Sequence, residues 1–161
     1  MAFMTMDDVQ RWLESYGEFA TAIENQRERL ETLRSRLEDP RAATPSGLPS
    51  GRGDLRDRLG AELGHLEDLE RRLQQDRQEA QALYRKIENA ICQITGPGWA
   101  HRRAVLRMRY LDLESWEQVC TMLFRRNADF AIRYDSYQRR TFKIHRQALN
   151  DLLEILSQEA K

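Results

Sequence analysis

SYQRRTFKIHRQALNDLLEIL, residues 136–156, has two chemically different faces when it is drawn as an α-helix. At about 100° per residue, one face gathers the side chains that can pack against a core: Thr141, Phe142, His145, Ala148, Leu149, Leu152 and Leu156. The opposite face gathers cations and amides: Arg139, Arg140, Lys143, Arg146, Gln147 and Asn150. Cations and amides contact the phosphates and base edges of nucleic acids. The segment therefore predicts an amphipathic helix with one packing face and one nucleic-acid-binding face.

The residues before this helix predict two shorter helices. Gly96-Pro97-Gly98 ends the preceding helix, and WAHRRAVLRMRYL, residues 99–111, predicts the first of the two. Ser115 with Gln118 three residues later forms a capping-box pattern, which predicts the start of the second helix. Residues 124–135 have no clear periodicity. Three helices, of which the third is basic, are typical of a trihelical helix-turn-helix domain whose third helix enters the major groove.

The N-terminal part contains two series of apolar residues spaced by seven. The first is Val9, Tyr16, Ile23, Leu30 and Leu37, and the second is Leu59, Leu66, Leu73, Ala80, Ile87 and Ile94. Pro40 ends the first helix, and the segment 39–53 is a loop rich in Pro, Gly and Ser. Two seams joined by so short a loop predict an antiparallel coiled-coil hairpin over residues 1–95, followed by the helix-turn-helix domain over residues 96–161. The fold class is therefore expected to be all-α.

The charge of the chain is balanced overall but unevenly distributed. The 26 basic and 26 acidic residues cancel. Residues 1–95 carry 14 Arg/Lys and 18 Asp/Glu, a net charge of −4, whereas residues 96–161 carry 12 and 8, a net charge of +4. This asymmetry predicts that the C-terminal part faces nucleic acid and that the N-terminal part has a different role.

Several function classes find no support in the sequence. No apolar run of about 18 residues is present to cross a membrane, and the N-terminus lacks the features of a signal peptide, so a cytoplasmic protein is expected. Cys92 and Cys120 are expected to be buried thiols, and the scattered histidines have no second ligand at metal-binding spacing. Without a phosphate loop or an activated nucleophile, we expect no metal, no cofactor and no enzymatic activity.

The candidate DNA-binding residues lie in and before the third helix. The candidates for base contacts are the polar residues of its early turns: Tyr137, Gln138, Arg139, Arg140 and Lys143. The candidates for backbone contacts are arginines further along the helix or in the segment before it: Arg125, Arg126, Arg133 and Arg146. For Arg102, Arg103 and Arg107 on the first helix, a solvated face is preferred over a backbone contact. Trp116 and His145 are expected in the core, the latter with a hydrogen bond.

LRMRYLDLESWEQVC, residues 106–120, and RRTFKIHRQAL, residues 139–149, resemble the phage and prophage regulators of the ArpU/RinA-like type. The C-terminal region of that family looks like region 4 of sigma-70 factors, and the heptad hairpin looks like the N-terminal part of many such proteins. The resemblance implies a helix-turn-helix that binds duplex DNA. This chain departs from the family pattern at residues 124–135, where a tight turn is expected.

These observations lead to a hypothesis and two alternatives. The chain is expected to be a phage-type transcriptional regulator that binds duplex DNA, with the hairpin serving for homodimerisation or for contact with RNA polymerase. Homodimerisation is considered because an isolated two-helix hairpin leaves apolar surface exposed. One alternative is a small terminase-like DNA-packaging component. The other is a helical adaptor that binds RNA polymerase without touching DNA.

Overall fold

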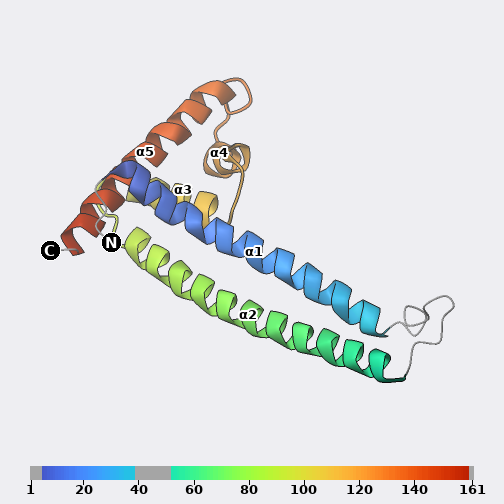
Figure 1. Cartoon of the computed structure of the whole chain (residues 1–161). Helices are drawn as coiled ribbons and strands as arrows, with labels where there is room; N and C mark the ends of the chain where they lie inside the picture. Colours follow the sequence, from blue (N-terminus) through green and yellow to red (C-terminus); the bar gives the residue numbers. More distant parts are fainter. Residues whose placement is uncertain (1–4, 39–51, 160–161) are drawn as a thin grey trace. The chain divides into compact units, whose positions relative to one another are not determined.

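Figure 1 shows a computed structural model of the chain, which describes residues 5–38 and 52–159. The elements in these residues are α1 (Met6–Glu38), α2 (Arg52–Cys92), α3 (Trp99–Leu106), the π-helical turn η1 (Arg107–Leu111), α4 (Trp116–Phe124) and α5 (Tyr134–Glu159). No strand occurs in the described part of the chain, so the predicted all-α class is confirmed. Most of the expected loop 39–53 lies outside the described residues, and its last two residues belong to α2.

The contacts divide the chain within its two long helices. The first compact unit contains the described residues of Met1–Glu18 and Gln81–Lys161, and the second is Phe19–Ala80. The boundary expected between residues 95 and 96 therefore falls inside the first unit, which also holds the start of α1 and the end of α2. Apolar side chains of these two helix ends belong to the same core as α5, as described below.

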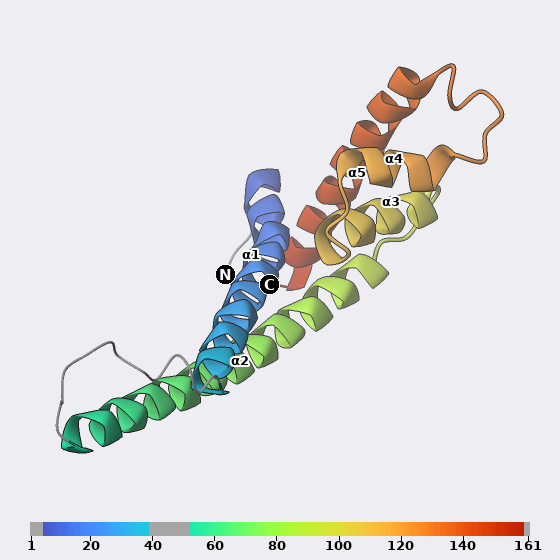
Figure 2. The ribbon, with the colours of Figure 1, turned by 90° about the vertical axis from the view of Figure 1, so that its right-hand side faces the viewer.

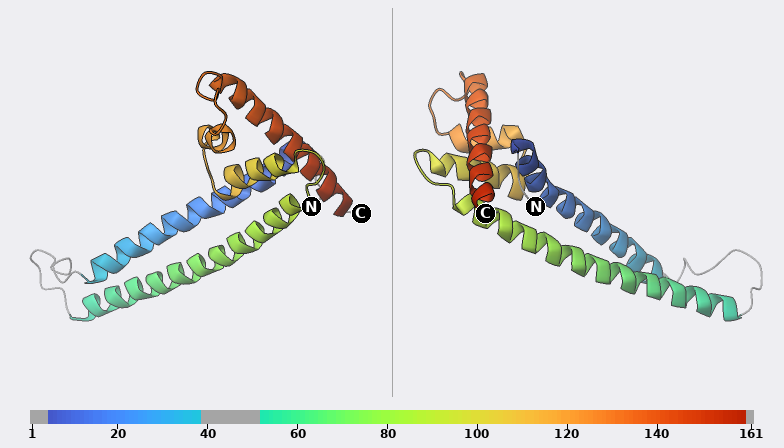
Figure 3. Two further views of the ribbon diagram at one scale, coloured as in Figure 1. Left: turned by 180° about the vertical axis from the view of Figure 1, so that it is seen from behind. Right: turned by 60° about the vertical axis from the view of Figure 1, so that its left-hand side comes forward.

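In the second unit, α1 and α2 pair in opposite directions (Figures 1 and 3). Gln26 Nε2 donates a hydrogen bond to Asp76 Oδ2 at 2.6 Å, and Arg34 forms an ion pair with Glu70. Gln26 precedes Arg34 on α1, whereas Asp76 follows Glu70 on α2. The contacting residues therefore run in opposite directions along the two helices, as in an antiparallel pair. The buried side chains between them are Leu30, Leu69, Leu73 and Ala80. Gln26 and Asp76 are polar residues of the paired segments, and their hydrogen bond gives the Gln26 Nε2 donor and the Asp76 carboxylate a partner across the helix pair, whereas Gln26 Oε1 is buried without a hydrogen-bond partner among the described residues.

The core of the first unit joins residues that lie far apart in the sequence. Its buried members from α1 and α2 are Val9, Leu13, Ile87, Ala90 and Ile91, with Ile94 just after α2. Those from α3, η1 and α5 are Leu106, Tyr110, Leu111, Ala148, Leu149, Leu152 and Leu156. Figure 2 shows α3 and α4 beside α5, and α5 contacts both. Helix α5 therefore packs along most of its length, because its apolar stripe meets several elements.

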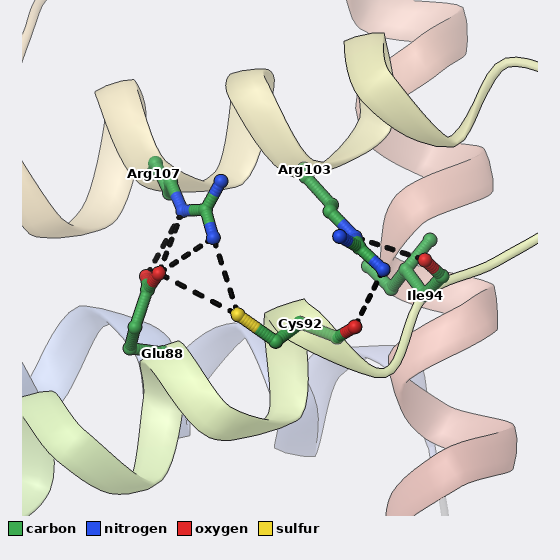
Figure 4. Close-up of polar contacts among 5 residues, drawn as sticks. All are labelled: Glu88, Cys92, Ile94, Arg103 and Arg107. Carbon is green, nitrogen blue, oxygen red and sulfur yellow. Dashed lines mark hydrogen bonds and ion pairs between the residues drawn. The ribbon is translucent and has the colours of Figure 1, made fainter.

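Arg102 and Arg103 of α3 donate hydrogen bonds to carbonyl groups at the end of α2 and just after it, and Figure 4 shows those of Arg103. Arg103 donates from Nε to Ile94 O at 2.9 Å and from Nη2 to Cys92 O at 2.5 Å. Arg102 donates from Nη2 to Thr95 O at 2.8 Å. The last carbonyl groups of a helix have no partners within the helix, so Arg103 supplies a donor to Cys92 O at the end of α2, while Ile94 O and Thr95 O lie just after the helix. The positive charge of both guanidinium groups is favourable beside that end of the helix.

Arg107 forms the other polar contact between α2 and the residues after it (Figure 4). Its guanidinium contacts both carboxylate oxygens of Glu88, the closest at 2.5 Å, and this hydrogen bonding lowers the pKa of Glu88. Its Nη2 lies 3.3 Å from Cys92 Sγ. Cys92 is exposed and Cys120 buried, so the expectation of two buried thiols is wrong for Cys92. The expectation of a solvated face for Arg102, Arg103 and Arg107 is also wrong, because their guanidinium groups bind within the protein.

The turn before α4 follows the capping pattern of the sequence. The N–H of Asp112 donates to Arg107 O at 2.9 Å, which closes the π-helical turn, and Leu113 adopts a positive φ of 58°. Arg109 donates to Glu114 O at 2.9 Å and lies over the ring of Trp116. Ser115 and Gln118 form both hydrogen bonds of the capping box, as predicted. The start of α4 is therefore stabilised both by the contacts of Arg109 and by the hydrogen bonds of the capping box.

Candidate nucleic-acid interface

The packing face predicted for α5 is confirmed with one exception. Its buried residues are Thr141, Ala148, Leu149, Leu152 and Leu156, and His145 is half-buried. Phe142 is 44% exposed, although its ring centroid lies 4.9 Å from that of Trp116. Phe142 therefore lies at the border between the core and the surface.

The opposite side of α5 carries cations that have no carboxylate partner among the described residues. Arg139, Arg140, Lys143 and Arg146 are exposed, and so are Arg125 and Arg126 directly after α4. None of these six side chains forms an ion pair with another described residue. Arg140 lies 5.2 Å above the ring of Phe124, the last residue of α4, which brings the α5 cations close to the segment that begins with Arg125. We call these six residues the basic face.

Tyr137 contacts side chains of the segment between α4 and α5. Its hydroxyl donates to Asp129 Oδ1 at 2.6 Å, which raises the pKa of Tyr137 and lowers that of Asp129. Its ring centroid lies 5.0 Å from that of Phe124 and 5.7 Å from that of Phe130. The phenol expected to contact a base is therefore engaged in anchoring residues 125–133. Gln138, the other candidate beside it, is half-buried.

The sequence reasoning missed this aromatic cluster, although a signal was present. Phe124, Phe130 and Tyr134 lie within residues 124–135, which have no helical period, and Tyr137 follows at the start of the amphipathic segment. Phe130 contacts Tyr134 as well as Tyr137, so the four rings pack around the start of α5. Arg133, expected at the DNA backbone, pairs instead with Asp129 at 3.5 Å. The long connection is therefore a folded turn, and it fixes the first turn of α5 relative to the end of α4.

His145 and Tyr110 form a polar contact at the inner side of α5. The Tyr110 hydroxyl lies 2.8 Å from His145 Nε2, and the Trp116 ring lies 4.8 Å from the imidazole. Burial, assisted by the nearby Arg109 charge, lowers the pKa of His145 to about 4, and burial raises the pKa of Tyr110 to about 12. Both side chains are therefore neutral near pH 7, so the phenol can donate to the imidazole nitrogen. This agrees with the expected hydrogen-bonded histidine.

We expect His145 to destabilise the first unit as the pH falls from about 6.5 to about 4. In this range the unfolded chain binds a proton at His145 and the folded chain does not, so folding is favoured at the higher pH. The loss should be roughly 1–2 kcal/mol, because the side chain keeps part of its contact with water. Urea unfolding at about pH 7 and about pH 4.5, followed by tryptophan fluorescence, measures it, with His145→Gln as a variant that does not titrate. Equal losses in both proteins would contradict the assignment.

The described residues contain no group of three His, Cys, Asp or Glu side chains that could hold a metal ion. No described helix is long and apolar enough to cross a membrane. The exposed charged groups of the basic face are the cations named above. Such groups bind anions, and the chemistry available to them is electrostatic attraction and hydrogen-bond donation.

No protein-family model, curated protein or solved structure matches this chain.

Proposed function

We propose that this chain binds duplex DNA through its basic face, as the helix-turn-helix of a phage- or prophage-type transcriptional regulator. The observation that carries the proposal is the set of six exposed cations on the basic face that lack a carboxylate partner in the described part of the chain. Cations that serve stability commonly pair with acids or cap helices, as Arg102, Arg103 and Arg107 do here. Cations left free on one face attract the phosphate backbone of nucleic acid.

The arrangement of α3, α4 and α5 supports a helix-turn-helix. Helix α4 is short and capped, and α5 contacts both α3 and α4. In helix-turn-helix complexes the N-terminal residues of the recognition helix contact base edges. Arg139 lies in the second turn of α5, which begins at Tyr134, and its side chain is exposed. We therefore assign α5 as the recognition helix and Arg139 as the first candidate for base contact.

The paired segments of α1 and α2 act, in this proposal, as an antiparallel coiled-coil hairpin. The Gln26–Asp76 hydrogen bond and the Arg34–Glu70 ion pair hold its register. Leu59 and Leu63 on α2 are 43% and 53% exposed. Exposed leucines on a long helix favour a role in pairing with a second copy or with the transcription machinery.

The direct test is binding of the protein to a labelled duplex of about 25 base pairs at increasing salt concentration. We expect binding at about 50 mM salt, with an association constant that falls as salt is added. If each of the six cations of the basic face neutralised one phosphate, the logarithmic slope would approach about −5. Protein that retains no DNA at low salt would contradict the proposal and favour the adaptor that binds polymerase only. A genome-wide map of bound fragments would then identify the specific site.

A further inference from the structure

A pocket of about 380 Å³ lies between the start of α3 and the middle of α5. From α3 and the residues before it come Pro97, Gly98, His101 and Arg102, and from α5 come Arg140, Lys143, Ile144 and Gln147. Both helices belong to the first unit, and they contact each other directly. The walls of the pocket are therefore set by the packing of two helices and not by a single exposed segment.

The lining of this pocket is cationic. Arg140 and Lys143 have no ion-pair partner among the described residues, and no carboxylate side chain lines the pocket. Arg102 is held in place, because its Nε lies 3.1 Å from Asp151 Oδ2 and its Nη2 donates to Thr95 O. Asp151 neutralises much of the Arg102 charge, so the free positive charge comes from Arg140 and Lys143. Two unpaired cations facing one cavity repel each other until an anion occupies it.

Hydrogen-bond donors complete the lining. The Gln147 side chain is exposed and lies one turn after Lys143 on the same helix. Helix α3 begins at the pocket with Gly98 in the left-handed conformation at φ 77°, and no side chain accepts a hydrogen bond at this start. The first turn of α3 also contains no acidic residue. An anion in the pocket would therefore meet donors as well as charge, and no group that repels it.

We propose that this pocket binds a phosphate group of the DNA backbone, with Arg140 and Lys143 supplying the charge and Gln147 donating a hydrogen bond. The inference rests on the proposed function, because it takes the phosphate from the duplex that α5 binds. It also assigns different roles in DNA binding to different residues of the basic face. Arg140 and Lys143 bind phosphate and contribute affinity for any sequence, whereas Arg139 remains for reading bases. Helix α3 then contacts the strand beside the groove that α5 enters.

The test uses the full chain and the variant Gln147→Glu. Its carboxylate lies four residues after Lys143 on the helix, so it pairs with that lysine and repels phosphate from the pocket. The matched control is Gln158→Glu, which makes the same change at an exposed position of α5 outside the pocket. Two probes are applied to each protein. Inorganic phosphate is titrated while the backbone N–H signals of residues 101 and 147, which all three proteins possess, are followed by NMR, and a duplex of about 25 base pairs is titrated at several salt concentrations.

We expect phosphate to shift these amide signals saturably in the wild-type protein and in Gln158→Glu, and not in Gln147→Glu. For the duplex, Gln147→Glu should bind about tenfold more weakly than wild type at low salt, with the salt slope reduced by about one, and to a similar degree for every sequence. Duplex binding that is equal in the two variants, with no phosphate-dependent shift in wild type, overturns the pocket and leaves the proposed function standing. Phosphate binding in a protein that binds no duplex overturns the proposed function and the assignment of the phosphate to DNA.

Discussion

Leu13→Ala should lower the free energy of unfolding of the first unit by about 2–5 kcal/mol, the cost typical of emptying a buried leucine site. Leu13 is fully buried, and it belongs to one core with Ile91, Leu106 and Leu152. Truncation removes its transfer free energy and leaves a cavity in the core that these residues share. Because the first unit includes both α1 and α5 residues, the destabilisation should extend to the α5 region.

Urea unfolding followed by tryptophan fluorescence measures this effect, because all three tryptophans, Trp12, Trp99 and Trp116, belong to the first unit. Far-UV circular dichroism provides a second signal that does not depend on Trp12, the neighbour of the changed residue. The control is Met122→Ala on α4, which truncates an apolar side chain of the first unit that is 54% exposed, and it should cost less than about 1 kcal/mol. If both variants lose the same stability, the start of α1 does not complete the core of the first unit.

The double variant Arg139→Gln with Arg140→Gln should weaken binding to a specific DNA site by about 2–6 kcal/mol if both arginines contact bases. If Arg140 binds phosphate instead, the decrease in specific binding should lie in the lower half of this range, and the salt slope should fall by about one. Both side chains are exposed, so the folded structure should survive the change. Within the protein, the change removes the cation–π interaction of Arg140 with the Phe124 ring, which is worth about 0.5–1 kcal/mol.

A matched control is available in the second unit, where Arg71 and Arg72 are also adjacent, exposed arginines on a helix. Changing both to glutamine alters the net charge by the same amount, but away from the basic face. DNA binding of this control should stay close to that of wild type in affinity and in salt slope. Equal decreases in the two double variants would mean that the total charge drives binding, and that α5 has no special role.

Much of the local structure could be predicted from the sequence. The capping box at Ser115 and, except for Phe142, the packing face of α5 appear in the structure, and a non-helical segment contains Gly96-Pro97-Gly98, although α2 already ends at Cys92. Each depends on residues within about one helical turn of each other, and such spacings are visible in a linear pattern. The cations of α5 are exposed as predicted, because a helix with one buried face must present the other to solvent.

The uses of individual polar residues could not be predicted in the same way. Arg103 and Arg139 are both arginines on helices, yet Arg103 binds the carbonyl groups at the end of α2 and Arg139 has no ion-pair partner among the described residues. Tyr137 donates to Asp129 across an aperiodic segment. Whether a side chain is used within the protein depends on groups that another element places beside it, and no periodicity encodes that placement.

The sequence alone therefore determined that the chain is helical, where its short C-terminal helices begin and end, and which face of α5 is basic. These features follow from backbone preferences and side-chain spacing over a few residues. Only the tertiary structure decided that the start of α1 and the end of α2 complete the core against which α5 packs. It also decided that three arginines of α3 and η1 bind the end of α2 and the residues just after it. Finally, it decided that two cations of α5 line a pocket beside α3. The physical reason is that burial and hydrogen bonding depend on which distant residues meet, and only the packing of whole helices brings them together.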